Sequence, residues 1–277
     1  MTLLTVMSQN IQYGARAEGR LEGLYETVEA VGPDLLMLQE CTDLADEQAR
    51  AEFTDRTGML IELAPSRNLP VAVAWNPARL TQDDVETRYW HELHHGYCSV
   101  HFTLPSRAEP LPVPLVAISA HLTPYSANQA ADEAALLAAR LYRAGGIGML
   151  AGDINHPTFD DPEPDWTRVP PYNRASRCVR RTGDEPWRSN RVVGQSLRDA
   201  DLTDVAAHLA DLRQDPGLRA ATGKAGLIRV DQVHVTLALR PAIRDYRMVE
   251  SSFSDHHGLL ATFDLDAIDR DAVIDYA

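Results

Sequence analysis

The sequence predicts an α/β protein in which short buried strands alternate with amphipathic helices. Apolar runs of about 4–8 residues recur along the chain and are bounded by Gly, Pro or Asn, which is typical of buried strands. Several of these runs are separated by stretches with apolar side chains at helical spacing that end at glycine. With 277 residues, 44% of them hydrophobic, the chain is long enough to bury a substantial core.

The N-terminal segment predicts a strand, a helix and a second strand. Residues 3–9 are apolar and β-prone and lead to Asn10. Residues 18–31 carry apolar side chains at helical spacing, and Gly32-Pro33 marks the end of that helix. The continuous apolar run 35–38 predicts a buried strand, which ends at Gln39-Glu40.

The next segment combines an acidic helix with four strand-like runs. The helix is expected at 43–56, and the strands at 58–64, 71–75, 85–90 and 97–104. A group of histidines in this segment suggests a metal cluster at first sight, because Cys98 and His101 follow His91, His94 and His95. The histidines have no helical apolar face and lie among strand-like residues, so we favour surface or edge-strand histidines over a metal site.

Two further strands end in polar side chains. The run 113–120 predicts a buried strand that ends at His121, and residues 126–143 predict an alanine-rich helix that stops at Gly145-Gly146. The run 147–151 predicts another strand, and after Gly152 it leads to Asp153 and Asn155. These two side chains share a face in an extended chain.

Residues 156–190 differ in composition from the rest of the chain. They are rich in Pro, Asp and Arg and show no clear period, so we expect a long specificity loop within one domain that spans residues 1–277. Its basic half includes Arg174 and Arg177 and contains Tyr172 and Trp187, a mixture that suits phosphate, base or sugar contacts. A solvated loop whose arginines pair with its own acids fits the composition equally well.

The C-terminal part predicts helices and strands around two acidic positions. Helices are expected at 189–198 and 203–212, and strands at 227–235, 244–251 and 259–265. Asp231 lies inside an otherwise apolar strand, where a carboxylate must be paired or functional because burying it alone is costly. Asp255 and His256 directly precede the last strand.

The overall charge and the cysteines restrict the functional classes. The net charge of −14 disfavours non-specific binding of nucleic acid and suggests that a phosphate site would need a bound cation. The three cysteines are widely spaced and odd in number, which favours a reducing, cytoplasmic location over a disulfide framework. No apolar run is long enough for a membrane span, and the N-terminus lacks signal-peptide features. We therefore expect a monomer that is not attached to a membrane.

Eight polar side chains stand at or near the ends of apolar strands: Asn10, Glu40, His121, Asp153, Asn155, Asp231, Asp255 and His256. Glu40 and Asp255 offer oxygen ligands that suit Mg²⁺ or Mn²⁺. His256 could accept a proton from water if Asp231 oriented its ring. Asn10, Asn155 and His121 could donate to phosphoryl oxygens, and Asp153 could position the water or protonate the leaving group.

Six short motifs occur in a recognisable order: Ser8-Gln9-Asn10-Ile11, Leu38-Gln39-Glu40, Ala120-His121-Leu122, Gly152-Asp153-Ile154-Asn155, Val230-Asp231-Gln232-Val233 and Ser254-Asp255-His256. Together they resemble the endonuclease/exonuclease/phosphatase superfamily, which includes DNase I. This resemblance implies a four-layer α/β sandwich of two packed mixed β-sheets flanked by helices.

The resemblance also implies a role for each residue. Glu40 corresponds to the main metal-binding glutamate, Asp255 to a second metal-associated carboxylate, and Asn10 to the asparagine at the metal and phosphate. Asp153 and Asn155 correspond to the pair at the scissile phosphate, His256 with Asp231 to the catalytic histidine, and His121 to a phosphate-contacting histidine. The glutamate that supports this second histidine in DNase I has no identifiable counterpart.

These expectations favour an Mg²⁺-dependent (or Mn²⁺-dependent) phosphoesterase that hydrolyses a P–O bond with water activated by His256 and Asp231. The alternative is an inactive binding protein that retains the fold, and the presence of Glu40, Asp153 and His256 argues against it. The substrate stays open between a nucleic acid, supported by Arg174 and Arg177 in the arginine-rich loop, and a small phosphorylated molecule, supported by the net charge.

Overall fold

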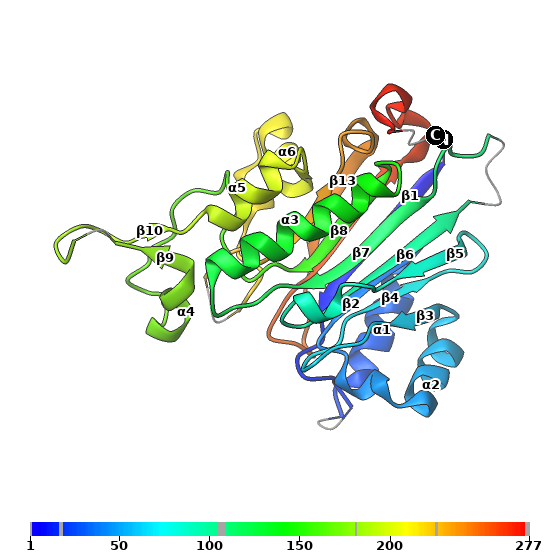
Figure 1. The fold of residues 1–277 in the computed structure, drawn as a ribbon. Helices are drawn as coiled ribbons and strands as arrows, with labels where there is room; N and C mark the ends of the chain where they lie inside the picture. Colours follow the sequence, from blue (N-terminus) through cyan, green and yellow to red (C-terminus); the bar gives the residue numbers. More distant parts are fainter. Residues whose placement is uncertain (1, 17–18, 105–108, 181, 225–226, 275–277) are drawn as a thin grey trace.

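Two mixed six-stranded sheets pack face to face, and helices cover their outer surfaces (Figure 1). The structure is a computed structural model that describes residues 2–16, 19–104, 109–180, 182–224 and 227–274. The four-layer α/β sandwich predicted from the sequence is confirmed. None of the helices within the described ranges is long and apolar enough to cross a membrane.

The first sheet has the strand order β13-β14-β1-β2-β4-β3. Its strands are β1 (Leu3–Asn10), β2 (Leu35–Gln39), β3 (Leu60–Leu63), β4 (Ala72–Trp75), β13 (Ile243–Val249) and β14 (Gly258–Asp264). The central pair β1 and β2 is parallel, and Asn10 is the register partner of Gln39. The two strands therefore end side by side, which places Asn10 next to Glu40.

The second sheet has the order β11-β12-β8-β7-β6-β5. Its strands are β5 (Thr81–Glu86), β6 (Tyr97–Thr103), β7 (Leu115–His121), β8 (Gly148–Asp153), β11 (Thr203–Asp204) and β12 (Asp231–Val235). Strands β7 and β8 are parallel, and His121 pairs in register with Asp153. Strand β12 runs antiparallel to β8 and brings Asp231 opposite Asp153.

The main core lies between the sheets, where Val6 and Met37 of the first sheet share one apolar cluster with Phe102 and Met149 of the second. Each fully buried side chain of this size contributes about 1.5–3 kcal/mol. A second cluster covers the first sheet and a third covers the second sheet. The helices are α1 (Leu21–Val31) and α2 (Glu47–Thr57) on the first sheet, α3 (Ala127–Arg143) and α5 (Val192–Asp199) on the second, and α6 (Val205–Arg213).

Helix boundaries follow the local signals in the sequence. Gly32 adopts φ 58°, and its N–H donates to the carbonyl of Val28. Helix α1 therefore ends at the glycine, as the sequence predicts. The side chains of Asp46 and Ser126 accept hydrogen bonds at the starts of α2 and α3. Short 3₁₀ turns lie at Thr42–Ala45, Trp90–Glu92, Pro216–Arg219, Arg240–Ala242, Leu265–Ala267 and Arg270–Ala272.

Two strand predictions were displaced. In place of the strand expected at 85–90, the structure has the edge strand β5, Thr81–Glu86. Its side chains are mostly polar and exposed and show no apolar pattern, so its position is set by pairing with β6. The strand expected at 227–235 begins only at Asp231. Residues 228–230 precede it and pack partly against the segment that follows β8.

The segment 156–190 contains regular structure that its composition does not reveal. It holds α4 (Pro171–Arg177) and the two-stranded pair β9 (Cys178–Val179) and β10 (Arg188–Ser189). Trp166, Val169 and Cys178 form a small apolar cluster with Ile228 and Val230. In Figure 1 the part with α4, β9 and β10 projects from the sandwich, and it is called the arm below.

Candidate active site

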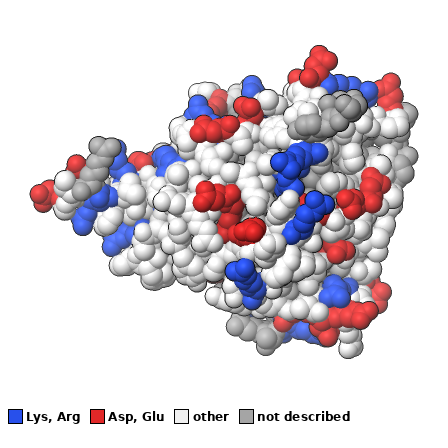
Figure 2. Space-filling view, viewed as in Figure 1, with Lys and Arg blue, Asp and Glu red and all other residues white. Residues whose placement is uncertain are grey.

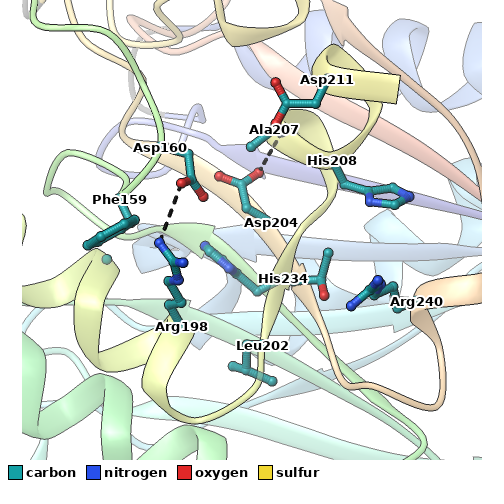
Figure 3. A pocket seen from close by; sticks show the side chains of 12 residues that line it. Phe159, Asp160, Arg198, Leu202, Asp204, Ala207, His208, Asp211, His234 and Arg240 are labelled. Atoms are coloured by element: carbon teal, nitrogen blue, oxygen red, sulfur yellow. Dashed lines mark hydrogen bonds and ion pairs between the residues drawn. The ribbon is translucent and has the colours of Figure 1, made fainter. Parts of the chain in front are cut away.

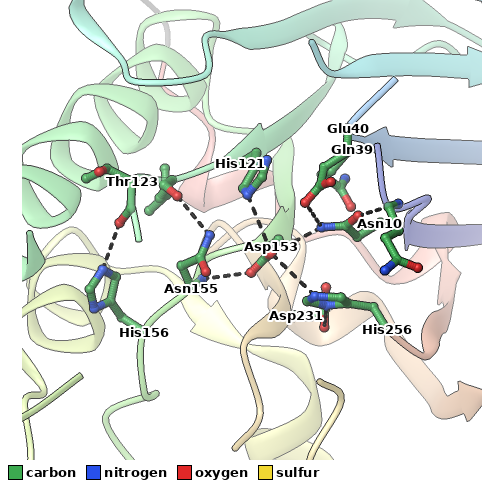
Figure 4. A network of polar contacts seen from close by, with 12 residues as sticks. Asn10, Gln39, Glu40, His121, Thr123, Asp153, Asn155, His156, Asp231 and His256 are labelled. Atoms are coloured by element: carbon green, nitrogen blue, oxygen red, sulfur yellow. Dashed lines mark hydrogen bonds and ion pairs between the residues drawn. The ribbon is translucent and has the colours of Figure 1, made fainter. Parts of the chain in front are cut away.

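The polar side chains at the strand ends converge between the two sheets (Figure 4). Asn10 ends β1, and Glu40 directly follows β2. His121 and Asp153 end β7 and β8, and Asp231 begins β12. Because β1, β2, β7 and β8 all end at the same edge, side chains distant in sequence meet there. His256 arrives from the turn before β14.

Backbone strain is concentrated at this edge. Glu40 and Asn155 both adopt a left-handed backbone, with φ 62° and φ 63°, as do Gln12 and Tyr13. Non-glycine residues in this region store free energy that the surrounding structure must offset, and such positions cluster at functional sites. Gly152 is required for a different reason, since a Cβ there would lie 1.9 Å from the carbonyl oxygen of Ala120.

Asp153 is the centre of the network. Its Oδ2 accepts a hydrogen bond from Nδ2 of Asn10 at 3.2 Å, and its Oδ1 accepts one from the backbone N–H of Asn155 at 2.9 Å. Nε2 of His121 lies 3.6 Å from Oδ2, and Nε2 of His256 lies 3.9 Å from it. Burial, reinforced by the neighbouring Asp231, raises the pKa of Asp153 to about 7 despite the nearby His256.

His256 and Asp231 form the predicted pair. Nδ1 of His256 lies 2.8 Å from Oδ2 of Asp231, which fixes the ring and directs Nε2 toward Asp153. The hydroxyl of Thr222 accepts the backbone N–H of Asp231 at 2.9 Å and steadies the pair. Burial favours a neutral ring, but the carboxylates of Asp231 and Asp153 outweigh it and raise the pKa of His256 to about 10.

His121 carries no charge at neutral pH. Burial, together with the nearby histidine rings, holds the pKa of His121 well below its usual value. Its Nε2 faces Asp153, and its Nδ1 has no hydrogen-bond partner among the described residues. His95, which we expected at the surface or on an edge strand, is buried and stacks on His121, with ring centroids 4.1 Å apart. That part of the expectation was wrong, because the turn before β6 folds inward.

Glu40 has the contacts expected of a metal ligand before it binds a metal. Its Oε1 accepts Nδ2 of Asn10 at 3.0 Å, and its Oε2 accepts the backbone N–H of Tyr13 at 2.8 Å. Each carboxylate oxygen keeps a lone pair, and ligand atoms of Glu40, His121 and Asp153 lie within 4.8 Å of one another. The carboxylate oxygens of Glu40 and Asp153 are hard donors that suit Mg²⁺ or Mn²⁺. Asp255 is exposed and belongs to neither of the possible metal-binding groups among the described residues.

Asn155 is held from both sides. Its Nδ2 donates to the carbonyl of Leu122 at 3.0 Å, while Arg177 donates to its side-chain oxygen and to its backbone carbonyl. One N–H of the carboxamide stays available for a phosphoryl oxygen. Arg177 therefore lies behind Asn155, whereas Arg174 donates to the carbonyl of Trp166 and packs over the ring of Trp187 in the arm. The structure brings Arg177 to the site and leaves Arg174 outside it.

A cleft of about 330 Å³ opens onto the candidate site residues. Asn155, Arg177, Asp255 and His256 line it, together with Tyr172, which the composition of the loop had singled out, and with Tyr13 and Lys224, which the sequence analysis had not. Tyr13 and Tyr172 are exposed aromatic side chains, and Lys224 is a cation whose ammonium group donates to the carbonyl of Ser254 at 2.6 Å. In the sequence, the signal for Tyr13 is its place two residues after the motif that ends at Ile11.

A second hollow, of about 270 Å³, shares no lining residue with this cleft (Figure 3). It lies beside α5 and α6. Each of the three carboxylates in its lining is paired with an arginine: Asp160 with Arg198, Asp204 with Arg229 and Asp211 with Arg219. Its lining contains none of the candidate site residues.

Positive charge is scattered on the face drawn in Figure 2, where lysines and arginines alternate with acids. Several basic side chains are drawn on the arm (Figure 2). Arg180 and Arg188 of the arm are exposed, as is Arg168 just before it. Arg180 lies over the ring of Trp187 at 4.4 Å. The arm therefore offers cations and an aromatic ring together, as its composition suggests.

Comparisons with known proteins identify a family and a fold. Residues 7–256 match the family model of the Endonuclease/Exonuclease/phosphatase family. A comparison with the curated proteins gives no match.

Solved structures with a similar fold include the 3'-5' exonuclease (NExo) from Neisseria meningitidis, with 17% identity and a TM-score of 0.63 over 94% of this chain and 100% of that one. An AP endonuclease from Archaeoglobus fulgidus has 16% identity and a TM-score of 0.62 over 94% and 99%. ANGEL2, a 2',3'-cyclic phosphatase, has 15% identity and a TM-score of 0.62 over 95% of each chain. At these identities the likeness establishes the fold.

Proposed function

The chain belongs to the endonuclease/exonuclease/phosphatase family, and on this premise we propose that it is a metal-dependent phosphoesterase. The observation that carries the proposal is the contact group formed by Asp231, His256 and Asp153. Asp231 orients His256 at 2.8 Å, and His256 then faces Asp153 at 3.9 Å. A substrate phosphate that lies between His256, Asn155 and His121 would be open to in-line attack by water from the Asp153 side.

The pKa values support a division of labour between the two central groups. Asp153, with its pKa raised to about 7, is the group that can take the proton from water near neutral pH. His256, with its pKa raised to about 10, carries a proton and stabilises the negative charge that builds up on the phosphate oxygens. Asp231 keeps the ring in place for either role, including the role of base that the sequence suggested for His256.

The dependence of the rate on pH distinguishes these roles. We expect kcat/KM to rise through about pH 7 as Asp153 ionises, and to fall near pH 10 as His256 loses its proton. Because Asp153 and His256 interact, the two apparent pKa values of the profile describe the pair and not each residue separately. If His256 were the base, the rate would keep rising through pH 10. A pH–rate profile in the presence of saturating metal decides between the two assignments.

Glu40, with Asn10 beside it, would hold the metal, and Asp255 at the rim of the cleft stays a prediction as a second ligand. Bound there, Mg²⁺ or Mn²⁺ would reduce the negative charge on the phosphate and stabilise the leaving oxygen. The fit rests on the unused lone pairs of Glu40 described above.

Removing the metal is expected to abolish turnover. Incubation with EDTA should stop the reaction, and added Mg²⁺ should restore it. Glu40→Gln should raise the Mg²⁺ concentration that gives half-maximal rate by about 10-fold or more, because one ligand charge is lost. Glu29→Gln, an exposed position on α1, is the matched control and should leave that concentration unchanged. Activity that survives chelation would exclude this mechanism.

For the substrate we propose a nucleotide-containing phosphodiester. The support is the cleft itself, in which the exposed rings of Tyr13 and Tyr172 stand beside Asn155 and His256. Aromatic faces next to a phosphate site suit stacked bases. A small phosphoester without a base is the second candidate, favoured by the net charge of −14.

Ionic strength separates the two candidates. If single-stranded nucleic acid binds through several phosphates along the arm, kcat/KM should fall steeply between about 50 and 200 mM salt. A substrate held only in the cleft should give a nearly flat response. The measurement uses a panel of single strands, duplexes with an abasic site, dinucleotides and phosphomonoesters. Failure to cleave any nucleotide-containing member, with turnover of a simple phosphomonoester, would overturn the proposed substrate.

An inactive binding protein is the remaining alternative. Such a protein would bind a phosphoester without turnover in the same panel at any metal concentration.

The cytoplasmic location and the monomeric state stay predictions. The three free, buried cysteines fit a reducing compartment.

A further inference from the structure

His121 lacks the support that an orienting hydrogen bond normally gives to a histidine in an active site. Such a ring is usually fixed by a bond at the nitrogen that faces away from the substrate. In His121 that nitrogen is Nδ1, and it has no hydrogen-bond partner among the described residues. Nε2, the other nitrogen, lies 3.6 Å from the carboxylate of Asp153, beyond hydrogen-bond distance. Polar contacts of the ring therefore do not explain its orientation.

The ring of His95 provides that support through its face. The two rings are nearly parallel, with an interplanar angle of 17° and a centroid distance of 4.1 Å. His95 is 4% exposed, so it is enclosed with His121 and not free to turn into solvent. The ring of His94 packs nearly perpendicular to that of His95, with ring centroids 4.4 Å apart, and the ring of Tyr125 packs in the same manner against His94, with centroids 5.4 Å apart. A continuous series of ring contacts therefore runs from the proposed catalytic site to the surface, through His121, His95, His94 and the exposed Tyr125.

Glu133 joins the two chain segments that carry the stacked rings. It belongs to α3 and is 3% exposed. Its Oε1 accepts the backbone N–H of His94, and its Oε2 accepts the backbone N–H of Thr123, both at 2.9 Å. Gln129 adds a third hydrogen bond to Oε1 at 3.1 Å. One buried carboxylate thereby fixes the turn before β6 against the turn after β7.

We propose that His95 is a positioning residue for His121, acting by ring stacking, and that Glu133 sets the distance between the two rings. His95 would replace, by its aromatic face, the carboxylate that could have held Nδ1 of His121. The inference rests on the proposed function, in which His121 contacts the substrate phosphate. It assigns a role to a histidine group that looked like a metal cluster in the sequence.

The test compares His95→Phe with His95→Leu. Phenylalanine keeps the stacked face and removes both ring nitrogens, and leucine removes the face. With the cleaved member of the substrate panel, His95→Phe should keep kcat within about 3-fold of the wild type. His95→Leu should lower kcat about 10-fold and leave KM within about 2-fold, because a small displacement of a catalytic group costs rate more than binding. His101→Leu, on strand β6, which follows the turn with His95, is the control and should change neither constant.

A second readout does not depend on turnover. In protein labelled with ¹⁵N-histidine, the ring signals of His121 should match the wild type in His95→Phe and should shift in His95→Leu, without substrate present. Unchanged His121 signals and wild-type kcat in His95→Leu would overturn the proposal. Equal loss in both variants would also overturn it, since the ring nitrogens and not the stack would then matter. If no substrate is turned over, the proposed function fails while the ring signals still test the stack.

Discussion

Replacing His256 with glutamine is expected to lower kcat by about 10³-fold or more while the folded structure is retained. His256 lies between Asp231 and Asp153, with Nδ1 2.8 Å from the carboxylate of Asp231 and Nε2 3.9 Å from that of Asp153. Glutamine keeps a polar side chain but cannot carry the proton that the raised pKa of His256 maintains at neutral pH. Single-turnover rates with saturating Mg²⁺ measure the effect on the chemical step.

Two companion variants make the result specific. His257→Gln changes the adjacent histidine, whose backbone N–H bonds to the carbonyl of Thr222, and it should leave kcat within a few-fold of the wild type. Asp231→Asn should be strongly deficient alone, and combining it with His256→Gln should add little, because the pair acts as a unit. A rate near that of the wild type in His256→Gln would remove His256 from the mechanism.

The positions of the candidate site residues could be predicted because each follows from a strong local constraint. Asn10, Glu40, His121 and Asp153 come directly at the ends of short apolar runs, and parallel strands align such ends at one edge of a sheet. The order of six motifs then identified the four-layer sandwich. Asp231 was noticeable because a carboxylate inside an apolar strand needs a partner, and His256 is that partner.

The residues that were missed act through contacts formed only in the folded chain. His95 is far from His121 in sequence, and no spacing rule predicts that their rings stack. Glu133 occupies an inward-facing position on an alanine-rich helix, where its two backbone hydrogen bonds come from separate turns. The helix and strands of the arm are short, and the apolar cluster beside them includes Ile228 and Val230 from a distant part of the sequence. Local patterns therefore gave the strands that carry the site and not the side chains that support it.

The metal ligands are an intermediate case. Glu40 lies where the motif implies, with lone pairs left for a cation. Asp255 follows the same logic in the sequence, but its side chain is exposed at the rim of the cleft. A residue in a turn has no strand register to fix its direction, so its position could not be predicted with the same certainty as that of Asp153. Its role as a second ligand stays a prediction.

Asp153→Asn is expected to lower kcat by about 10³-fold and, at the same time, to stabilise the protein at alkaline pH. The loss of rate follows from removing the group that accepts the proton from water. The gain in stability follows from burial, which together with Asp231 raises the pKa of Asp153 from 3.8 to about 7. Ionising this carboxyl group therefore costs more free energy in the folded chain than in the unfolded chain.

The sign of this effect fixes its dependence on pH. Since the pKa of Asp153 is higher in the folded state, the destabilisation is absent well below pH 3.8, grows as the pH rises toward about 7, and is constant above that. Asparagine has no charge to bury, so the melting temperature of Asp153→Asn minus that of the wild type should be larger at pH 8 than at pH 5. Differential scanning calorimetry at the two pH values measures this difference. Asp55→Asn, at an exposed position on α2, should show no such trend.

The two readouts of Asp153→Asn test different statements. Loss of rate with a melting temperature that rises more at pH 8 than at pH 5 would mean that the active site holds an ionised carboxylate at the expense of stability. A variant that loses rate and is equally destabilised at both pH values would contradict the raised pKa. In that case the hydrogen bonds from Asn10 and Asn155, and not the charge, would be the main contribution of Asp153 to the fold. Retained activity would instead exclude Asp153 as the proton acceptor and leave His256 in that role.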